Sequence, residues 1–317
     1  MSNTPYGGME TVSCPISNSK DFTPYLQVAD RFDSSGKRDW QLVRSCASGL
    51  IMLNPRPDSD EIAMHYRNGE YEPYRHSQNS SSFKERAYLA ARSMLLGYRA
   101  GIILKGCAKP LEECVVLEIG CSTGDLLHYY HRKGLPLNNL AGVEPDPDAA
   151  RYAREVFGLN IFPSIAEEGA ERRTFDRIVL WHTLEHIHGI NETLHEVAHQ
   201  LKPDGVLVIA VPNPASVDAE QYGKHWIAYD APRHLYHFWQ GTLEKLLVLH
   251  KLSVFKRIPY FPDTVYNMLY SEALLSKREQ RTFNALRIAT LLGRVAIDAV
   301  KGGERASSVV YFARRAE

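Results

Sequence analysis

Short apolar runs alternate with segments of helical periodicity through the middle of the chain. Residues 115–119 are mostly apolar, which is typical of a strand buried on both faces of a parallel sheet. Apolar positions spaced three and four residues apart indicate helices between such runs. Strands are predicted at 115–119, 140–143, 161–162, 177–181 and 206–211, and helices at 124–133, 146–157 and 192–201. Strands that alternate with helices in this way predict a doubly wound α/β sheet.

The pattern changes at both ends of this region. Residues 1–76 are rich in Pro, Tyr, Asn and Ser and predict a small irregular domain, and the polar run 77–82 predicts a linker. A main domain is predicted over 83–317. Its remaining elements are a helix at 83–105, a helix at 241–250, a strand at 252–258, a helical insertion at about 263–303 and a strand at 308–313. The predicted fold class is α/β, a Rossmann-like, mostly parallel sheet of seven strands.

The loop after the first predicted strand is rich in glycine and should form a ligand site. Ligands of such sheets bind beyond the carboxyl ends of the strands, at the point where the strand order reverses. The loop runs from Gly120 to Gly124, and glycine allows a tight turn and a close backbone approach. A dinucleotide fingerprint would also need glycine at 122 and 125, where this chain has Ser122 and Asp125. A pyrophosphate cradle is therefore poorly supported.

Two acidic residues adjoin this loop and favour a cationic ligand. Glu118 stands two residues before Gly120, where a carboxylate would repel phosphate. Glu144 ends the second strand, 24 residues after Gly120, where an acid can accept both hydroxyls of a ribose. The amino group and sulfonium of S-adenosylmethionine are cationic and suit this arrangement. The alternative is that both acids merely cap strand ends in solvent.

With these features the chain resembles the class I S-adenosylmethionine-dependent methyltransferases, over residues 83–260. The resemblance rests on VLEIGCSTGD (116–125), GVEPD (142–146), FDRIVLWHTLEHI (175–187) and LKPDGVLVIAVPN (201–213). It implies that the loop glycines contact the methionine part of the cofactor, Glu144 the ribose, and Trp181 and His182 the adenine and sulfonium region. The predicted cofactor-binding residues are Glu118, Gly120, Ser122, Gly124, Glu144, Trp181 and His182.

Two histidine patterns suggest zinc instead. Residues 195–199 match H-E-x-x-H and residues 182–186 match H-x-x-E-H, in which histidines one helical turn apart bind zinc. Leu194 and Val197 belong to the apolar stripe of the first helix, so His195 and His199 should lie nearer solvent. The second pattern begins at a strand end. A zinc-dependent hydrolase that uses His195, Glu196 and His199 is therefore an alternative, and no metal is expected in the preferred interpretation.

The segment 222–239, rich in aromatic residues and histidine, follows the fifth strand and should form the acceptor pocket. It resembles a D-x-P-R-H-x-x-x-F stretch of family members from sugar and surface-polysaccharide pathways. His234 is the candidate catalytic base, because imidazole titrates near working pH. Arg233 is the candidate ligand of an anionic group, and the predicted substrate-binding residues are Tyr229, Asp230, Arg233 and His237. The alternative is that Arg233 pairs with Asp230 and that His234 is structural.

Residues 14–57 resemble a zinc ribbon that often precedes such methyltransferases. Only Cys14 occupies a ligand position of that ribbon, because Ser17, Ser45 and Ser48 stand at the others and Cys46 is one place out of register. Structural zinc normally takes four Cys or His ligands. A degenerate ribbon without metal is therefore predicted, held by its strands and aromatic residues.

Composition narrows the function further. The chain has 37 acidic and 37 basic residues and no basic run, so nothing in its charge favours nucleic acid. Five cysteines without a signal peptide predict reduced thiols and a cytoplasmic protein. The apolar stretch 283–300 carries Arg287, Arg294 and Asp298, too much charge for a membrane span.

We therefore expect a methyltransferase that acts on a small molecule, a sugar or lipid-linked intermediate, with S-adenosylmethionine as cofactor. A homodimer is a further expectation. A non-catalytic protein that binds S-adenosylmethionine is the second alternative.

Overall fold

The computed structural model describes residues 8–33, 39–66, 83–107, 109–167, 174–303 and 305–316. The chain forms two compact units. Unit 1 consists of Met1–Glu70, His182–Asn191 and Ala210–Tyr311, and unit 2 of Tyr71–Trp181, Glu192–Ile209 and Phe312–Glu317. These units differ from the ranges expected from the sequence, and the linker predicted at 77–82 lies outside the described residues.

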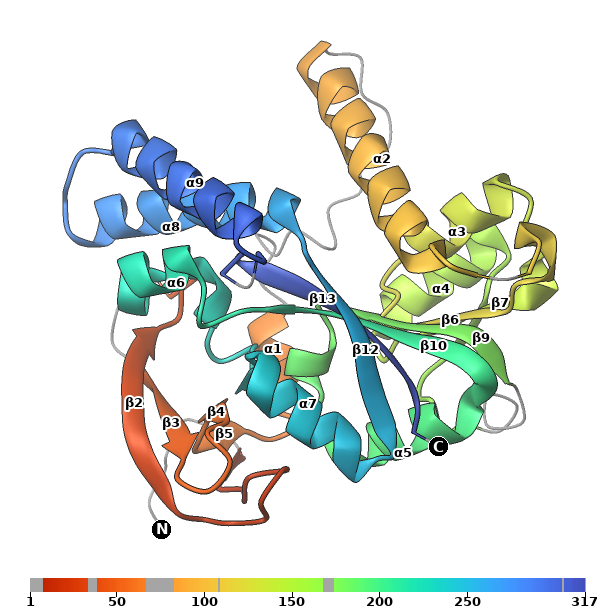
Figure 1. Ribbon diagram of the computed structural model, residues 1–317, viewed down its shortest axis with the longest axis horizontal. Coiled ribbons are helices and arrows are strands. Elements are labelled where there is room, and N and C mark those ends of the chain that lie inside the picture. Colours follow the sequence, from red (N-terminus) through yellow and green to blue (C-terminus); the bar gives the residue numbers. More distant parts are fainter. Residues whose placement is uncertain are drawn as a thin grey trace. The chain divides into compact units, whose positions relative to one another are not determined.

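Seven strands form the central sheet in the order β12-β13-β10-β9-β6-β7-β8 (Figure 1). β6 is parallel to β7 and β9, and β7 is parallel to β8. The strands are β6 Val116–Ile119, β7 Leu140–Val143, β8 Asn160–Phe162, β9 Phe175–Trp181, β10 Leu201–Pro212, β12 Leu252–Pro259 and β13 Ser308–Arg315. The predicted α/β fold with a mostly parallel sheet of seven strands is confirmed.

The order of the strands reverses at β6. The chain runs from β6 outward through β7 to β8, and then returns to place β9 on the opposite side of β6. In such a sheet the loops that leave neighbouring strands on either side of the reversal diverge and leave room for a ligand. The loop after β6 therefore leaves the sheet at its switch point.

Helices of unit 2 alternate with these strands, as the pattern predicted. They are α2 Phe83–Leu104, α3 Asp125–Arg132, α4 Pro147–Phe157 and most of α5 Ile190–Gln200, with the short 3₁₀ helices η2 Leu111–Glu113 and η3 Leu137–Asn139. Asp146 begins α4 because its carboxylate accepts hydrogen bonds from the amides of Asp148 and Ala149. Proline follows at the first helical position, and Gly158 ends the helix in a left-handed conformation.

A separate antiparallel sheet in unit 1 has the order β11-β4-β3-β2. Its strands are β2 Phe22–Ala29, β3 Asp39–Ser45, β4 Ile51–Leu53 and β11 Tyr236–His237, and β1 Met9–Glu10 pairs separately with β5 Arg56–Pro57. The sequence led us to expect irregular structure here. Most residues of β2 are half-buried or exposed, and its register shifts between Pro24 and Leu26, so it lacks the regular alternation that marks a strand.

The fourth strand of this sheet comes from the distant segment 222–239. Tyr236 and His237 of β11 pair with Met52 and Ile51 of β4. The sheet thus connects the N-terminal strands with the segment expected to hold the acceptor.

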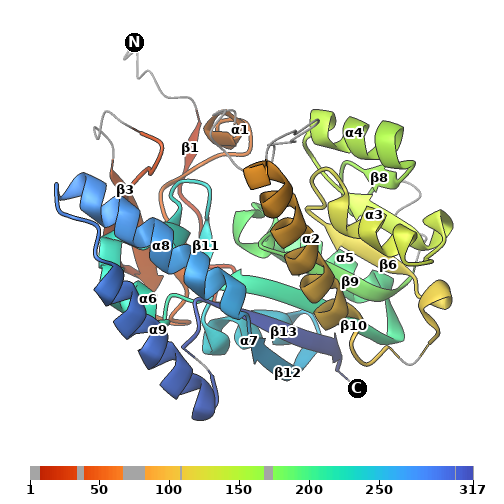
Figure 2. The ribbon, with the colours of Figure 1, turned by 90° about the horizontal axis from the view of Figure 1, so that it is seen from above.

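The predicted helical insertion before the last strand is confirmed. It consists of α8 Phe261–Arg278 and α9 Ala285–Val300, which follow β12 and precede β13 in the sequence. The two helices pack side by side (Figure 2). The other helices of unit 1 are α1 Ile62–Tyr66, η4 Leu184–His186, α6 Val217–Tyr222, η5 Gly223–His225, η6 Ile227–Tyr229 and α7 Gln240–Leu249. In the part of the chain that the structure describes, no helix is long and apolar enough to cross a membrane.

Candidate functional site

The loop between β6 and α3 has three residues in the left-handed region. Gly120, Ser122 and Gly124 have φ angles of 73°, 48° and 79°. A side chain at such an angle is strained, so Ser122 is unusual, and glycine is the residue that fits this position best. Gly124 is the more constrained, because an added Cβ would lie 2.5 Å from Cδ1 of Leu159.

Glu144 closes the loop from the end of β7. Its Oε2 accepts a hydrogen bond of 2.8 Å from the amide of Ser122, and its Oε1 accepts one of 2.9 Å from the amide of Asp146. The side chain is buried, and this burial raises its pKa. The alternative in which Glu144 only caps a strand in solvent is therefore wrong. Each carboxylate oxygen retains a lone pair for a further donor.

Glu118 is buried in β6 and carries an atom without a partner. Its Oε1 pairs with the guanidinium of Arg99 from α2, whereas its Oε2 has no hydrogen-bond partner among the described residues. Cζ of Arg99 also lies 4.7 Å from the ring centroid of Trp181, the last residue of β9. Burial raises the pKa of Glu118 to about 7, although Arg99 opposes this shift. The solvent-exposed alternative is wrong for Glu118 as well.

Arg99 was missed at the sequence level. The helical pattern of 83–105 places a basic residue on a helix before the first strand, but several basic residues lie there. Only the packing of α2 selects Arg99 as the partner of Glu118.

The charge of this site suits a cation. Glu118 interacts electrostatically with Glu144 and with Asp125, which begins α3. Two buried carboxylates and an unpartnered carboxylate oxygen would repel a phosphate. They fit ribose hydroxyls and the cationic groups of S-adenosylmethionine, so the residues present suit this cofactor.

His182 follows β9 in a strained conformation. Its φ of 52° is left-handed, and non-glycine residues in this region often mark functional sites. Nε2 lies 2.6 Å from Oδ2 of Asp263 in α8, and Nδ1 lies 3.5 Å from Oε1 of Glu185. Burial lowers its pKa, but Asp263 and Glu185 outweigh burial and raise the pKa to about 10. The ring is therefore an imidazolium at neutral pH. Asp263, 81 residues away, was also missed at the sequence level.

Arg233 lies in a buried ion cluster within unit 1. Its Nη2 lies 2.7 Å from Oδ1 of Asp30 and 2.7 Å from Oδ1 of Asp230, while Arg31 reaches Asp230 at 2.9 Å. Only 1% of Arg233 is exposed. This geometry favours the alternative in which Arg233 pairs with Asp230 and holds the segment together.

His234 is buried beside two other side chains that can bind protons or metals. Its Nδ1 lies 2.8 Å from the carbonyl oxygen of Ala228, so this nitrogen donates and Nε2 carries the lone pair. Burial and His186 lower the pKa of His234 to about 4, which keeps the ring neutral at neutral pH. Ligating atoms of Glu185, His186 and His234 all lie within 4.8 Å of one another.

The remaining predicted acceptor residues are also buried. The hydroxyl of Tyr229 lies 3.2 Å from that of Tyr25 in β2. His237 packs against the Tyr229 ring with a centroid distance of 5.2 Å, and its Nε2 has no partner within the part of the chain described. The structure therefore gathers Tyr229, His234 and His237 around one buried region of unit 1.

The H-E-x-x-H pattern lies on α5 as expected from its apolar stripe. Leu194 and Val197 are buried, and the rings of His195 and His199 are exposed with centroids 4.5 Å apart. The group of potential metal ligands that the described residues form is at Glu185, His186 and His234, not here.

The four ribbon positions come together in unit 1. Sγ of Cys14 lies 3.1 Å from Oγ of Ser48, and Oγ of Ser17 lies 3.4 Å from Oγ of Ser45. The amide of Ser48 also donates to Oγ of Ser45. Hydrogen bonds therefore join these four positions, and the degenerate ribbon stays a prediction.

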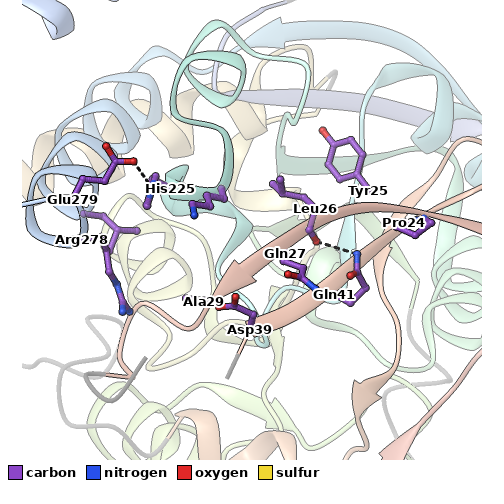
Figure 3. A pocket seen from close by; sticks show the side chains of 12 residues that line it. Pro24, Tyr25, Leu26, Gln27, Ala29, Asp39, Gln41, His225, Arg278 and Glu279 are labelled. Carbon is purple, nitrogen blue, oxygen red and sulfur yellow. Dashed lines mark hydrogen bonds and ion pairs between the residues drawn. The ribbon is translucent and has the colours of Figure 1, made fainter. Parts of the chain in front are cut away.

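A pocket of about 720 Å³ in unit 1 holds none of the predicted site residues (Figure 3). Residues of β2, β3, η5 and α8 line it. Arg278 donates to the carbonyls of Asp30 and Asp33, Gln41 donates to those of Leu26 and Leu42, and His225 pairs with Glu279 at 3.2 Å. These side chains therefore contact other parts of the chain.

Comparisons with known proteins identify the family of this chain. Among curated proteins, the ubiquinone biosynthesis O-methyltransferase of Rickettsia bellii (strain OSU 85-389) is 21% identical over 181 residues, 55% of this chain and 74% of that protein. Among solved structures, magnesium protoporphyrin IX methyltransferase from Synechocystis PCC 6803 with bound SAH has a TM-score of 0.50 and 11% identity, covering 82% of this chain and all of that chain.

A second solved structure, an S-adenosylmethionine-dependent methyltransferase from Mesorhizobium loti, has a TM-score of 0.45 and 16% identity, covering 69% of this chain and all of that chain. The family model described as a methyltransferase domain matches residues 74–251, more than half of the chain. The chain therefore belongs to this methyltransferase family, the class I enzymes that use S-adenosylmethionine.

Proposed function

We propose that this protein methylates a hydroxyl group of a small molecule, a sugar or lipid-linked intermediate. Its likeness to a ubiquinone biosynthesis O-methyltransferase supports oxygen as the acceptor atom. The resemblance of 230–238 to enzymes of sugar and surface-polysaccharide pathways supports the class of acceptor. The buried imidazole of His234, with its Nε2 free for a proton, is the observation that carries the proposal.

On the donor side, we assign Glu144 to the ribose hydroxyls and Oε2 of Glu118 to the cationic end of the donor. Glu144 keeps lone pairs beyond its two backbone hydrogen bonds. Oε2 of Glu118 is buried without a partner among the residues described, and a ligand donor would satisfy it. Gly120, Ser122 and Gly124 bring the loop backbone close to the ligand. The indole of Trp181 covers the adenine and sulfonium region.

On the acceptor side, His234 takes the hydroxyl proton while the oxygen takes the methyl group. S-adenosylmethionine supplies an electrophilic methyl group on a positively charged sulfur. In that transfer the new oxygen–carbon bond would replace the carbon–sulfur bond, whose electron pair would stay on sulfur. The positive charge ends on the imidazolium of His234, which Glu185 and Asp230 stabilise electrostatically. We assign Tyr229 and His237 to the wall of the acceptor site.

The experiment separates donor binding from transfer. Glu144→Ala should weaken S-adenosylmethionine binding by more than about 10-fold in calorimetry, since a buried charge-assisted hydrogen bond contributes about 1.5–3 kcal/mol. His234→Gln should leave this affinity within about twofold. It should reduce methyl transfer at least about 100-fold across a panel of hydroxylated sugars, phenols and lipid-linked acceptors.

Glu196→Ala, at a half-buried position of α5 outside both proposed sites, is the matched control and should change neither quantity. Unchanged binding in Glu144→Ala would refute the donor site. Binding of S-adenosylmethionine without transfer to any acceptor would instead favour a non-catalytic binding protein.

A further inference from the structure

We propose that Glu185, His186 and His234 form a binding site for a divalent transition-metal ion such as zinc. The three side chains come from η4 and from the segment before β11, and all belong to unit 1. Their ligating atoms lie within 4.8 Å of one another. Two imidazoles and one carboxylate form a ligand set that zinc uses where it keeps a position open for water or substrate.

The carboxylate is the first argument, because it lacks the hydrogen bonds that its burial requires. Glu185 is 1% exposed, and neither Oε1 nor Oε2 has a hydrogen-bond partner among the residues that the structure describes. Nδ1 of His182 lies 3.5 Å from Oε1 of Glu185, an ion-pair distance that still leaves both carboxylate oxygens without a hydrogen bond within the described chain. A buried carboxylate without hydrogen bonds is costly, and a metal ion would satisfy it.

The orientation of the two imidazoles is the second argument. Nδ1 of His234 donates to the carbonyl of Ala228 at 2.8 Å, and Nδ1 of His186 donates to the carbonyl of Arg233 at 3.0 Å. The hydroxyl of Tyr66 lies 2.8 Å from the same nitrogen of His186. These bonds leave Nε2 as the lone-pair atom in both rings. Metal-binding histidines typically donate their other ring nitrogen to a carbonyl or carboxylate in this way.

The ligand types and spacing limit which ions fit. Imidazole suits zinc, copper, iron and nickel, whereas magnesium and calcium prefer sites made of oxygen atoms. Ligand atoms of tetrahedral zinc, at about 2.0–2.1 Å from the metal, lie about 3.3 Å from one another. The site must therefore contract by about 1.5 Å at most from its present spacing. Side-chain rotations of this size are compatible with binding.

A bound metal ion would use Nε2 of His234, the same atom that takes the proton in the proposed reaction. Nε2 of His234 has one lone pair, which can hold either a metal ion or a proton. A bound ion should therefore inhibit methyl transfer reversibly, and a chelator should restore it. Binding itself is measured without turnover, so its failure and the failure of the proposed function are distinguishable.

The experiment uses the full chain, stripped with EDTA and titrated with Zn²⁺ and with Co²⁺. We expect metal analysis by mass spectrometry to find one equivalent of zinc per chain. The cobalt-loaded protein should show the visible absorption of a four- or five-coordinate ion with nitrogen and oxygen ligands. Glu185→Gln and His186→Gln should each weaken the ion more than about 100-fold, beyond the 10–100-fold loss typical of outer partners. His195→Ala, in the exposed H-E-x-x-H pattern, is the matched control and should keep full affinity.

Circular dichroism establishes that each variant is folded. If a variant does not fold, the cobalt spectrum and a zinc-dependent rise in the melting temperature of the wild type still test the site. Failure of the wild type to bind either ion would overturn the proposal. Stoichiometric zinc that persists in Glu185→Gln but disappears in His195→Ala would overturn it as well and place the metal on α5.

Discussion

At the residue scale, the donor loop owes its properties to carboxylates that the fold removes from water. Glu118 keeps one oxygen paired with Arg99 and the other unpartnered within the described chain. Its pKa, raised by burial to about 7, makes it titrate where enzymes work. If Glu118 contacts the cofactor, the affinity for this cationic ligand should change as Glu118 titrates. If Glu118 only forms a structural ion pair with Arg99, that affinity should not follow its titration.

Affinity for S-adenosylmethionine should therefore rise with pH. Between pH 6 and pH 8 Glu118 changes from mostly neutral to mostly ionised, so Kd should fall by about 10-fold when measured by calorimetry. The contribution of Glu118 to the free energy of unfolding should instead fall as pH rises. Because the folded pKa lies above the ordinary 4.5, the contribution of Glu118 to stability is complete below pH 4.5 and is lost as pH rises through about 7.

Glu118→Gln separates this effect from the titration of the ligand. Glutamine keeps the size of the side chain and removes its charge, so the variant should bind more weakly and show a much flatter pH profile. Equal pH dependence in the two proteins would contradict a contact between Glu118 and the cofactor.

At the element scale, the N-terminal strands form a sheet that only a distant segment completes. β11 supplies the edge strand next to β4, although Tyr236 of β11 stands 184 positions after its partner Met52. The turns of this sheet bring Cys14 beside Ser48 and Ser17 beside Ser45. The degenerate zinc ribbon therefore stays a prediction, with serines at three of its four ligand positions.

Restoring the thiolates should restore the metal. Sulfur atoms of a tetrahedral zinc site lie about 3.8 Å apart, close to the present 3.1 and 3.4 Å contacts. The triple variant Ser17→Cys, Ser45→Cys, Ser48→Cys should bind one more zinc than the wild type and give an intense sulfur-to-cobalt charge-transfer band. Adding Cys14→Ser to the triple variant should abolish that extra zinc. No gain of metal in a folded triple variant would show that the strands do not have ribbon geometry.

At the scale of the whole molecule, a buried ion cluster links residues about 200 positions apart. Arg233 lies between Asp30 and Asp230, and Arg31 joins the same cluster. Such a cluster is costly to interrupt, because removal of its central cation deprives Asp30 of its guanidinium partner and leaves Asp230 with Arg31 alone within the described chain.

Arg233→Met should therefore lower the free energy of unfolding by about 3–5 kcal/mol in urea titrations. The matched control is Arg257→Met, since Arg257 pairs with Glu244 at the surface and that pair contributes under about 1 kcal/mol. A similar small loss in both variants would mean that Arg233 is not the centre of a structural cluster. Its guanidinium would then again be a candidate for binding an anionic acceptor.

The local features of the donor site were predictable because they depend on neighbours in the sequence. The strand at 140–143, the Asp-Pro start of α4 and the glycine turn each follow from local residue preferences. The partners of the charged groups were not predictable. Arg99, Asp263 and Asp30 lie on other elements, and the sequence holds no signal that selects them from other residues of the same charge.

The sequence by itself determined the alternation of strands and helices and the glycine loop, because periodicity and turn chemistry act over a few residues. Its resemblance to a known family indicated the methyl donor. Only the tertiary structure decided that β11 completes the N-terminal sheet, that Asp30 joins Arg233 and that His234 lies beside Glu185 and His186. These pairings join side chains across long stretches of chain. They form because a buried charge or lone pair is removed from water, so only a partner within the folded protein can stabilise it.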